Sequence, residues 1–270
     1  MQNFEGDREP MAGLIAIPVF NEVGNLPPVI RSLAERFPAA NLLFIDDGSS
    51  DGSYRLIEAA GLSLLRHPIN LGYEETLKTA MRQALIGGHE YVVFFDSDGQ
   101  HRVEDLATII RSYETDPCDL IVGSRYRGVK RIPLTLRSLG TRFFSRLTTW
   151  LSGVKITDVT CGLKLISRRF IPVALKLSTE DMHAELIVGL SRCGARVREE
   201  KITVLSRETG QSMYHLYKGL LYPAKTFLCL LGELIFYRRL KAEVGSADRV
   251  DADAGESSVE SDQTHKGELG

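Results

Sequence analysis

The first half of the chain alternates short apolar runs with segments whose apolar residues recur every three or four positions. The runs of strand length cover residues 14–20, 41–45, 62–66, 91–95 and 120–123. The segments with helical spacing cover residues 26–37, 74–86 and 103–113, and another follows residue 52. This alternation predicts an α/β fold with a mostly parallel, twisted sheet, right-handed crossovers and helices on both faces.

Two of the predicted helices have recognisable beginnings. Pro27 and Pro28 suit the first turn of a helix, where a missing N–H group leaves no hydrogen bond unmade. Ser50 or Asp51 suits the N-cap of the helix that follows residue 52, because a side-chain oxygen there can accept a backbone N–H.

Polar residues follow three of the predicted strands. Asn21-Glu22 comes after the first strand, Asp46-Asp47 after the second and Asp96-Ser97-Asp98 after the fourth. In open parallel sheets, ligands bind beyond the carboxyl ends of the strands. Acids at three separate strand ends on one rim therefore predict a single shared binding site.

The acidic motif after the fourth strand has the chemistry of a metal site. Strand alternation lets Asp96 and Asp98 share one face, and two carboxylates at the end of a buried strand need a cation or strong donors. With the amide oxygen of Gln100, they form a set of hard oxygen ligands suited to Mg²⁺ or Mn²⁺, which commonly bridge protein and substrate phosphates. Taken alone, the motif is equally compatible with an acidic turn.

Length and cysteine content narrow the class of protein. The 270 residues, 43% of them hydrophobic, suffice for one large α/β domain. The four cysteines are far apart and form no CxxC pair, which indicates reduced thiols. The polar N-terminus is unlike a signal peptide, and the apolar stretch 226–232 is shorter than the ~20 residues of a membrane span. We expect a cytoplasmic protein, peripheral on the cytosolic face of a membrane.

The second half contains two segments in which basic and large apolar residues alternate. Residues 125–155 carry many lysines and arginines and no acid. Residues 218–241 also combine basic residues with large apolar ones. A solvated or packed face is the simple interpretation, and a surface lying on anionic lipid is the functional one. Residues 244–270 are acidic, with few large apolar residues, and are expected to be disordered.

Seven motifs in order resemble those of glycosyltransferase family 2 enzymes, which have the GT-A fold. The branch that the chain resembles contains dolichol-phosphate mannosyltransferases and bacterial polyprenyl-phosphate glycosyltransferases, and the likeness covers roughly residues 13–215. The motifs are IPVFNE (17–22), IDDGSSDGS (45–53), HPINLG (67–72), FDSDGQH (95–101), GSRY (123–126), DVTCGLKLISR (158–168) and SRETGQS (206–212).

The resemblance implies a nucleotide pocket at the first two strand ends. Pro18, Phe20 and Glu22 match positions that line this pocket, where rings and apolar groups contact the base and a carboxylate accepts hydrogen bonds. Ile45 and Asp47 match the pair that recognises the base.

The resemblance also implies roles for the acidic motif. Asp96, Ser97 and Asp98 match positions around the nucleotide sugar, and Gln100 joins Asp96 and Asp98 as a ligand of Mg²⁺ or Mn²⁺. Asp98 is counted among the catalytic residues because the ion it holds would neutralise the leaving nucleoside diphosphate.

On the acceptor side, the resemblance implies two arginines and an acid. Arg125 and Arg207 match cations that hold the diphosphate and the acceptor phosphate, for which the guanidinium fork is suited. Glu185 matches an acidic residue near the acceptor, and Asp158 lies in the segment that closes over the sugar.

Two positions depart from the pattern of that branch. Met213 stands where a phosphate-contacting lysine is usual. The usual small residue after HPxNxG is replaced, giving Gly72-Tyr73-Glu74-Glu75. These departures bear on the choice of donor and on how its diphosphate is held, and leave the expected fold unchanged.

The resemblance implies inverting, metal-dependent transfer of a sugar from GDP-mannose or a UDP-sugar to a polyprenyl or dolichyl phosphate. The expected partners are the donor, this acceptor, the membrane surface and an integral-membrane partner or a second copy, without nucleic acid. The expected organisation is a flexible segment 1–12, a GT-A domain 13–215, an amphipathic helix 216–243 and the tail 244–270. The alternatives are a soluble saccharide acceptor, a phosphatase of the haloacid dehalogenase type, whose nucleophile loop also reads DxDG, and an inactive nucleotide-sugar-binding module.

Overall fold

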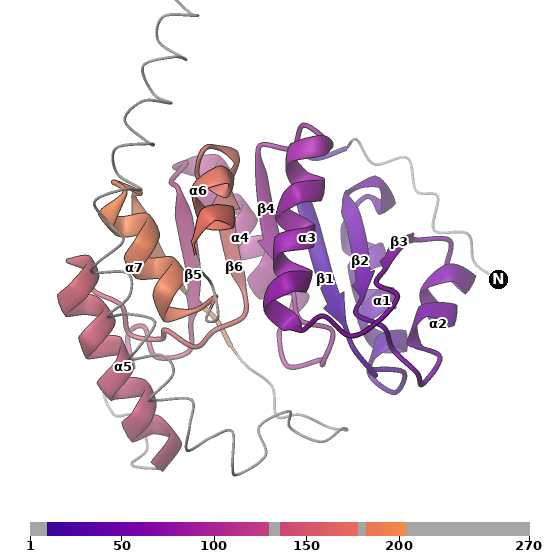
Figure 1. Cartoon of the computed structure of the whole chain (residues 1–270), viewed down its shortest axis with the longest axis horizontal. Coiled ribbons are helices and arrows are strands. Elements are labelled where there is room, and N and C mark those ends of the chain that lie inside the picture. Colours follow the sequence, from indigo (N-terminus) through magenta and orange to yellow (C-terminus); the bar gives the residue numbers. More distant parts are fainter. Residues whose placement is uncertain (1–9, 130–135, 178–181, 204–270) are drawn as a thin grey trace, which may run out of the picture.

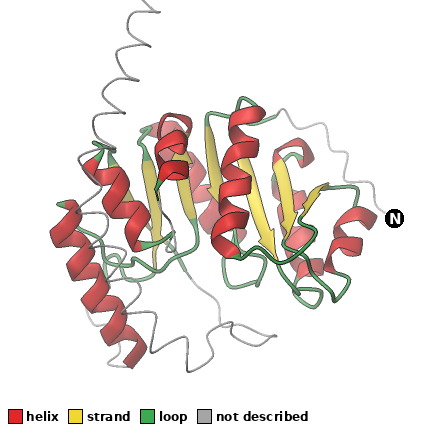
Figure 2. Cartoon of the chain, viewed as in Figure 1, coloured by secondary structure: helices red, strands yellow, loops and turns green. Residues whose placement is uncertain are grey.

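The computed structural model describes residues 10–129, 136–177 and 182–203. In these ranges a seven-stranded sheet carries helices on both faces (Figures 1 and 2). The strands are β1 (Gly13–Val19), β2 (Leu42–Asp46), β3 (Ser63–Arg66), β4 (Tyr91–Phe94), β5 (Leu120–Ser124), β6 (Lys164–Ser167) and β7 (Val197–Lys201). The helices are α1 (Leu26–Arg36), α2 (Ser53–Ala59), α3 (Tyr73–Ile86), α4 (Val103–Thr115), α5 (Leu136–Ser152), α6 (Ile171–Lys176) and α7 (Ala184–Arg192), with short 3₁₀ turns η1 (Ala39–Asn41) and η2 (Arg168–Phe170).

The sheet is mostly parallel, as the alternating pattern predicts. Its strand order is β3-β2-β1-β4-β6-β5-β7, and in the described part of the chain β6 alone runs against its neighbours. The five strands of the first half match their predicted positions to within two residues. Strands β6 and β7 were not predicted, because one is a four-residue run and the other, with sequence VREEK, is rich in charge.

Two apolar layers hold the helices against the sheet, because strand residues alternate between its faces. On β1, Leu14 and Ala16 face one layer, while Ile15, Ile17 and Val19 face the other. The second layer is completed by α1, α2 and α4.

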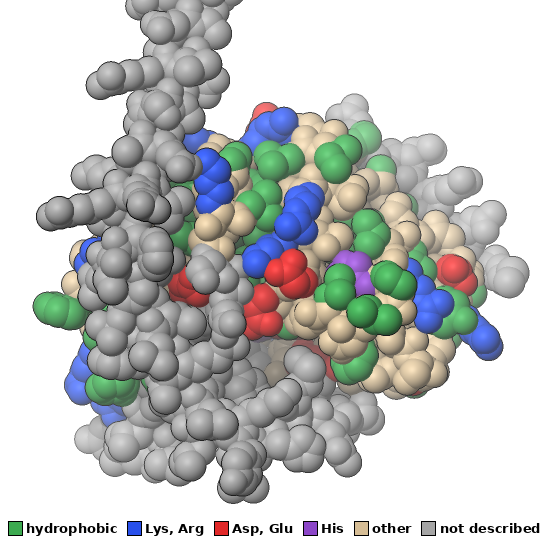
Figure 3. Space-filling model, viewed as in Figure 1, with side chains coloured by type: hydrophobic (Ala, Val, Ile, Leu, Met, Phe, Trp, Pro, Cys, Tyr) green, Lys and Arg blue, Asp and Glu red, His purple; other side chains and the backbone are tan. Residues whose placement is uncertain are grey.

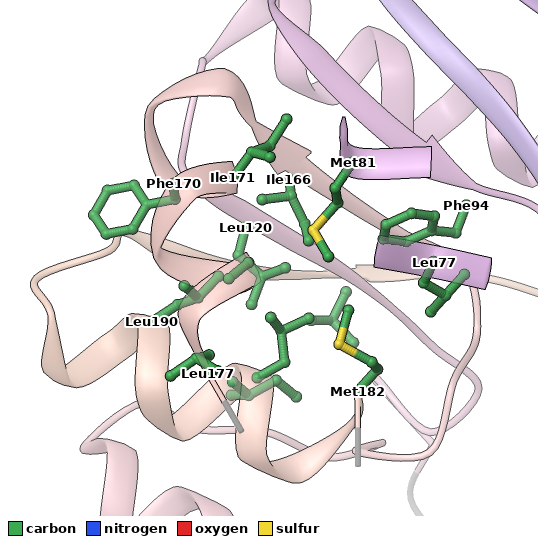
Figure 4. Close-up of a cluster of buried hydrophobic side chains, with 14 of the residues drawn as sticks. Leu77, Met81, Phe94, Leu120, Ile166, Phe170, Ile171, Leu177, Met182 and Leu190 are labelled. Carbon is green, nitrogen blue, oxygen red and sulfur yellow. The ribbon is translucent and has the colours of Figure 1, made fainter. Parts of the chain in front are cut away.

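The first layer joins β1, β4, β5 and β6 to α3, α5, α6 and α7 (Figure 4). Leu77 and Met81 of α3 lie beside Phe94 of β4, and Leu190 of α7 lies beside Leu120 of β5 (Figure 4). Burial of such side chains contributes about 1.5–3 kcal/mol each. This packing fixes the first turn of α3 relative to the end of β4.

The predicted helix beginnings are partly confirmed. Pro27 and Pro28 lie in the first turn of α1. The N-cap of α2 is Gly52, with φ +90°, so the prediction of Ser50 or Asp51 as the cap was wrong. Asp51 nevertheless accepts a 2.9 Å hydrogen bond from the N–H of Ser53, the first residue of the helix.

Several predicted features lie outside the described residues. They are Arg207, Met213, the helix 216–243, the tail 244–270 and most of the segment 1–12. Within the described ranges, no helix is both long and apolar enough to cross a membrane.

Candidate functional site

The three polar strand ends lie side by side, because β2, β1 and β4 are consecutive in the sheet. One hydrogen bond ties the loop after β2 to β1, and another ties the loop after β4 to β1. The N–H of Asp47 donates to the carbonyl of Val19 at 2.8 Å, and the buried hydroxyl of Ser97 donates to the carbonyl of Pro18 at 2.7 Å. The prediction of one shared rim is therefore confirmed.

Side-chain hydrogen bonds join the loop after β1 to the loop after β2. Asn21, with φ +54°, accepts from the N–H of Ser50 at 2.9 Å through its Oδ1. In return, the hydroxyls of Ser49 and Ser53 accept from the N–H groups of Asn21 and Glu22, both at 2.9 Å. The polar residues of IDDGSSDGS thus shape the rim of the site.

The predicted nucleotide-pocket residues divide into exposed and interior positions. Phe20 and Glu22 are half-buried on the rim, where a ligand can reach them. Pro18 is buried within β1, and Ile45 is fully buried in the first apolar layer. Ser97, also predicted to contact the nucleotide sugar, is buried and bonded to backbone.

Asp47 is buried and holds the loop between β3 and α3. Its Oδ1 accepts from the N–H of Leu71 at 2.9 Å and lies 2.7 Å from Nδ1 of His67. Its Oδ2 accepts from the N–H of Gly72 at 2.8 Å. His67 Nε2 lies 3.1 Å from the Thr79 hydroxyl, so the same network reaches α3.

Asp46, the preceding acid, is fully buried and pairs with Arg66, whose Nε lies 3.0 Å from its Oδ2. The Arg66 guanidinium also lies 3.8 Å from the centre of the Tyr54 ring. The acids at the strand ends therefore divide into two buried ones, Asp46 and Asp47, and the partly exposed ones after β1 and β4.

The acidic motif after β4 is partly exposed and held from several elements. Asp96 Oδ1 accepts a 2.9 Å hydrogen bond from the Tyr73 hydroxyl, and its Oδ2 lies 3.5 Å from Nε2 of His101. Asp98 Oδ1 accepts from the N–H of Gln100 at 3.0 Å. The predicted metal ligands Asp96, Asp98 and Gln100 therefore occupy one loop, at the β4 side of the rim.

Electrostatic surroundings keep Asp96 ionised. Burial raises the pKa of its carboxyl, but hydrogen bonds from His101 and Tyr73 and the nearby charge of Lys164 outweigh burial and lower the pKa. The backbone of Gly162 also abuts the carboxylate, so that a side chain at this position would collide with Asp96 Oδ2.

The donor set suits a hard divalent cation shared with substrate. Across the described residues, no group of three or more His, Cys, Asp or Glu side chains is arranged to enclose a metal ion. Mg²⁺ is typically held by one or two carboxylates together with substrate phosphates and water. Asp96 and Asp98 are partly exposed, and Asp96 is kept anionic by its surroundings, so the two carboxylates fit that kind of open site.

A buried lysine and a histidine lie next to the acidic motif. Lys164 of β6 donates through Nζ to the carbonyl of Cys161 and lies 2.8 Å from Nδ1 of His183. The His183 ring stacks on Tyr73, with centroids 6.4 Å apart and an interplanar angle of 15°. Sequence reasoning noted Tyr73 only as a departure from the family pattern, and it missed His101, Lys164 and His183, although His101 and Lys164 lie within quoted motifs.

Arg125, predicted to hold phosphate, is paired with Asp158. Its Nε and Nη2 lie 2.6 and 2.7 Å from the two carboxylate oxygens, and Nη2 also donates to the Thr160 hydroxyl at 2.6 Å. Burial raises the pKa of the Asp158 carboxyl, but the interactions with Arg125 outweigh it and lower that pKa. Asp158 is fully buried, so this pair fastens the end of β5 to the loop before β6.

The remaining acceptor-side residues are only partly described. Glu185 lies in the first turn of α7 and is buried. Arg207 lies outside the described residues. On the face of the molecule in Figure 3, acidic side chains gather near the centre, beside lysine or arginine side chains.

Comparisons with known proteins agree with the geometry. A family model described as glycosyl transferase family 2 matches residues 14–172. The chain is 26% identical over 253 residues to the UDP-N-acetylglucosamine dolichyl-phosphate N-acetylglucosaminyltransferase of Methanococcus voltae, covering 86% of this chain and 96% of that relative. It is 28% identical over 213 residues to the undecaprenyl-phosphate mannosyltransferase of Micrococcus luteus, covering 75% and 87%.

The fold is shared with a solved enzyme. Glucosyl-3-phosphoglycerate synthase of Mycobacterium tuberculosis, in complex with Mg²⁺ and UDP, matches with a TM-score of 0.59 at 15% identity, over 82% of this chain and 78% of that one. This likeness supports the GT-A fold. The family model spans more than half of the chain and includes all three strand ends of the rim. The chain therefore belongs to glycosyltransferase family 2 and is a glycosyltransferase.

Proposed function

We propose that this glycosyltransferase moves a sugar from a nucleotide sugar to a polyprenyl phosphate at a membrane surface, with inversion at the anomeric carbon. The observation that carries the proposal is the meeting of three polar strand ends on one rim, where Asp96 and Asp98 follow β4. The names of the relatives from Methanococcus voltae and Micrococcus luteus, both of which include a polyprenyl-type phosphate, support the acceptor.

On this proposal, the nucleotide lies against the ends of β1 and β2, and its diphosphate faces the acidic loop after β4. Phe20 and Glu22 are the rim residues available to a base or sugar. When bound, Mg²⁺ or Mn²⁺ held by Asp98, with Asp96 and Gln100, supplies charge neutralisation for the leaving nucleoside diphosphate. Asp96 is held in its ionised form by Tyr73 and His101.

A lipid-phosphate acceptor also fits the catalytic groups. An acceptor phosphate oxygen is already anionic and needs little help from a general base. Attack from the face opposite the leaving group inverts the anomeric carbon, and positioning then supplies much of the rate.

The test of the donor is a thermal-shift panel of GDP- and UDP-sugars, with and without Mn²⁺. One donor is expected to raise the melting temperature in a Mn²⁺-dependent way, because a ligand that binds the native state stabilises it by mass action. Transfer from that donor to polyprenyl phosphate is then measured against transfer to a soluble saccharide. Transfer to the saccharide alone would replace the proposed acceptor, and stabilisation by no donor would contradict the proposal.

One face of α5 has the composition of a membrane-contacting surface. Its buried side includes Phe144 and Leu151, which pack into the first apolar layer. Its outer side carries Phe143 and Trp150, which are 59% and 78% exposed, with the exposed Arg146 between them. Aromatic residues flanked by arginine are suited to the headgroup region of an anionic bilayer. We propose that this face rests on the membrane.

Trp150 provides a direct measurement, because it is the single tryptophan of the chain. Its emission is expected to shift to shorter wavelength when anionic vesicles are added. Phe143→Ser should weaken vesicle binding about five- to thirtyfold, since an inserted aromatic ring contributes about 1–2 kcal/mol of transfer free energy. Ile86→Ser is the matched control, because Ile86 is 78% exposed on a different helix. Equal vesicle binding by the two variants would contradict the proposal that this face of α5 contacts the membrane.

A further inference from the structure

Tyr73 joins two acidic strand ends that the sequence presents as separate motifs. It is the first residue of α3, and its hydroxyl donates to Asp96 Oδ1 at 2.9 Å. We propose that Tyr73 is a positioning residue that sets the Asp96 carboxylate, and that Asp47 sets Tyr73. The inference rests on the proposed function, since it names how the rim is held for sugar transfer.

The first half of this link runs from Asp47 to Tyr73. Asp47 accepts the N–H groups of Leu71 and Gly72, at 2.9 and 2.8 Å, through its two oxygens. Gly72 has φ +99°, a conformation that favours glycine, and the next residue is Tyr73. The end of β2 therefore fixes the backbone that enters α3.

A second contact holds the same helix in place. His67, which lies 2.7 Å from Asp47, reaches Thr79 one and a half turns into α3, at 3.1 Å. The start of α3 is thus fixed both at its entering backbone and along its side. A buried network in which these groups bond to one another restricts the helix more than one hydrogen bond would.

The second half of the link runs from Tyr73 to Asp96. The Tyr73 ring is held by its stacking on His183, which lies beside Lys164. Asp96 is bounded by the Tyr73 hydroxyl on Oδ1, and by His101 and the backbone of Gly162 on the Oδ2 side. Tyr73 comes from α3, and the backbone that enters α3 is held by Asp47 at the end of β2. Displacement of α3 would therefore change the orientation of Asp96.

The conservative substitution Tyr73→Phe tests this role, because it keeps the ring and removes the hydroxyl. We expect kcat to fall about tenfold, since a misplaced group at a reaction centre costs at least this much, while the Kd for metal-free nucleoside diphosphate stays within about twofold. Tyr91→Phe is the matched control, because the buried Tyr91 hydroxyl makes no hydrogen bond within the described part of the chain. Wild-type kcat in Tyr73→Phe would overturn the inference.

A double-mutant cycle distinguishes positioning from general weakening of the fold. If Tyr73 acts through Asp96, then Asp96→Asn combined with Tyr73→Phe should lower kcat no further than Asp96→Asn alone. If the fold-loss of kcat in the double variant equalled the product of the losses in the two single variants, the inference would be overturned.

The same cycle in urea unfolding separates this inference from the proposed function. Non-additive shifts of the urea midpoint are expected for Tyr73→Phe and Asp96→Asn, whether or not the wild-type protein transfers sugar. Absence of transfer from every donor would refute the proposed function alone. Additive midpoint shifts would refute the link between Tyr73 and Asp96 alone.

Discussion

Asp98→Ala is expected to lower the rate of sugar transfer by about a hundredfold or more, the effect typical of removing a group that stabilises developing charge. Asp98 lies in the loop after β4, near Asp96 and on the rim. Its side chain is partly exposed, and its Oδ1 accepts the backbone N–H of Gln100 at 3.0 Å, so the substitution removes a carboxylate from the rim and not from the apolar layers. The measurement is transfer to polyprenyl phosphate at saturating donor and Mn²⁺.

The control for Asp98→Ala is Glu58→Ala, which removes an exposed carboxylate from α2, away from the acidic loop. The two variants should unfold in urea close to the wild-type midpoint. Near-wild-type transfer by a folded Asp98→Ala protein would show that the acidic motif is not the catalytic centre.

Asp158→Ala is expected to destabilise the protein by about 3 kcal/mol, because it leaves a largely buried guanidinium without its counter-charge. Asp158 accepts from the Arg125 side chain through both oxygens and also from the Arg125 N–H at 3.0 Å. Its own N–H donates to Glu199 at 2.9 Å, so the lost carboxylate lies inside a network that includes β7. Urea unfolding measures the change.

One comparison variant tests whether burial of the pair accounts for this destabilisation. Asp116→Ala breaks an exposed pair with Arg196 and Arg198 and should leave the urea midpoint close to wild type, since exposed pairs contribute little. If Asp116→Ala lowered the stability in urea as much as Asp158→Ala does, burial of the Arg125–Asp158 pair would not explain the destabilisation.

The effect of Asp158 should also depend on pH. Because the pKa of this carboxyl is lowered in the folded state, its stabilisation is fully present above the unfolded value of about 3.9. That stabilisation is lost as the pH falls through the folded value. The difference between wild type and Asp158→Asn should therefore be largest near neutral pH and shrink below about pH 4. If the difference in stability between wild type and Asp158→Asn grew as the pH fell, the pKa of Asp158 would not be lowered in the folded state.

The parts of the fold that were predictable are those set by local pattern. Strands β1, β2, β4 and β5 are apolar runs that end at or within two residues of a Gly, Asn or Asp, and helices α1, α3 and α4 have a continuous apolar stripe. Strand β6 was not predictable in this way. Its residues KLIS are buried on both faces, and their direction is set by pairing with β4 and β5, which are distant in the sequence.

The candidate site shows the same division. The adjacency of three polar strand ends follows from strand order, so reasoning from the sequence brought Glu22, Asp47 and Asp96 to one rim. The hydrogen-bond and ion-pair partners of the site residues could not be predicted from the sequence. Arg125 has the chemistry of a phosphate ligand, and its pairing with Asp158 depends on the loop before β6 folding back onto β5.

The reversed strand β6 also has a consequence for the order of assembly. Strands β1 to β4 can pair as soon as residue 94 has been synthesised, but the outer edge of β4 gains its partner only when residues 164–167 are available. An unpaired strand edge is a template for pairing with another chain. During translation, the open side of β4 is therefore a position at which self-association can compete with folding until β6 pairs with it.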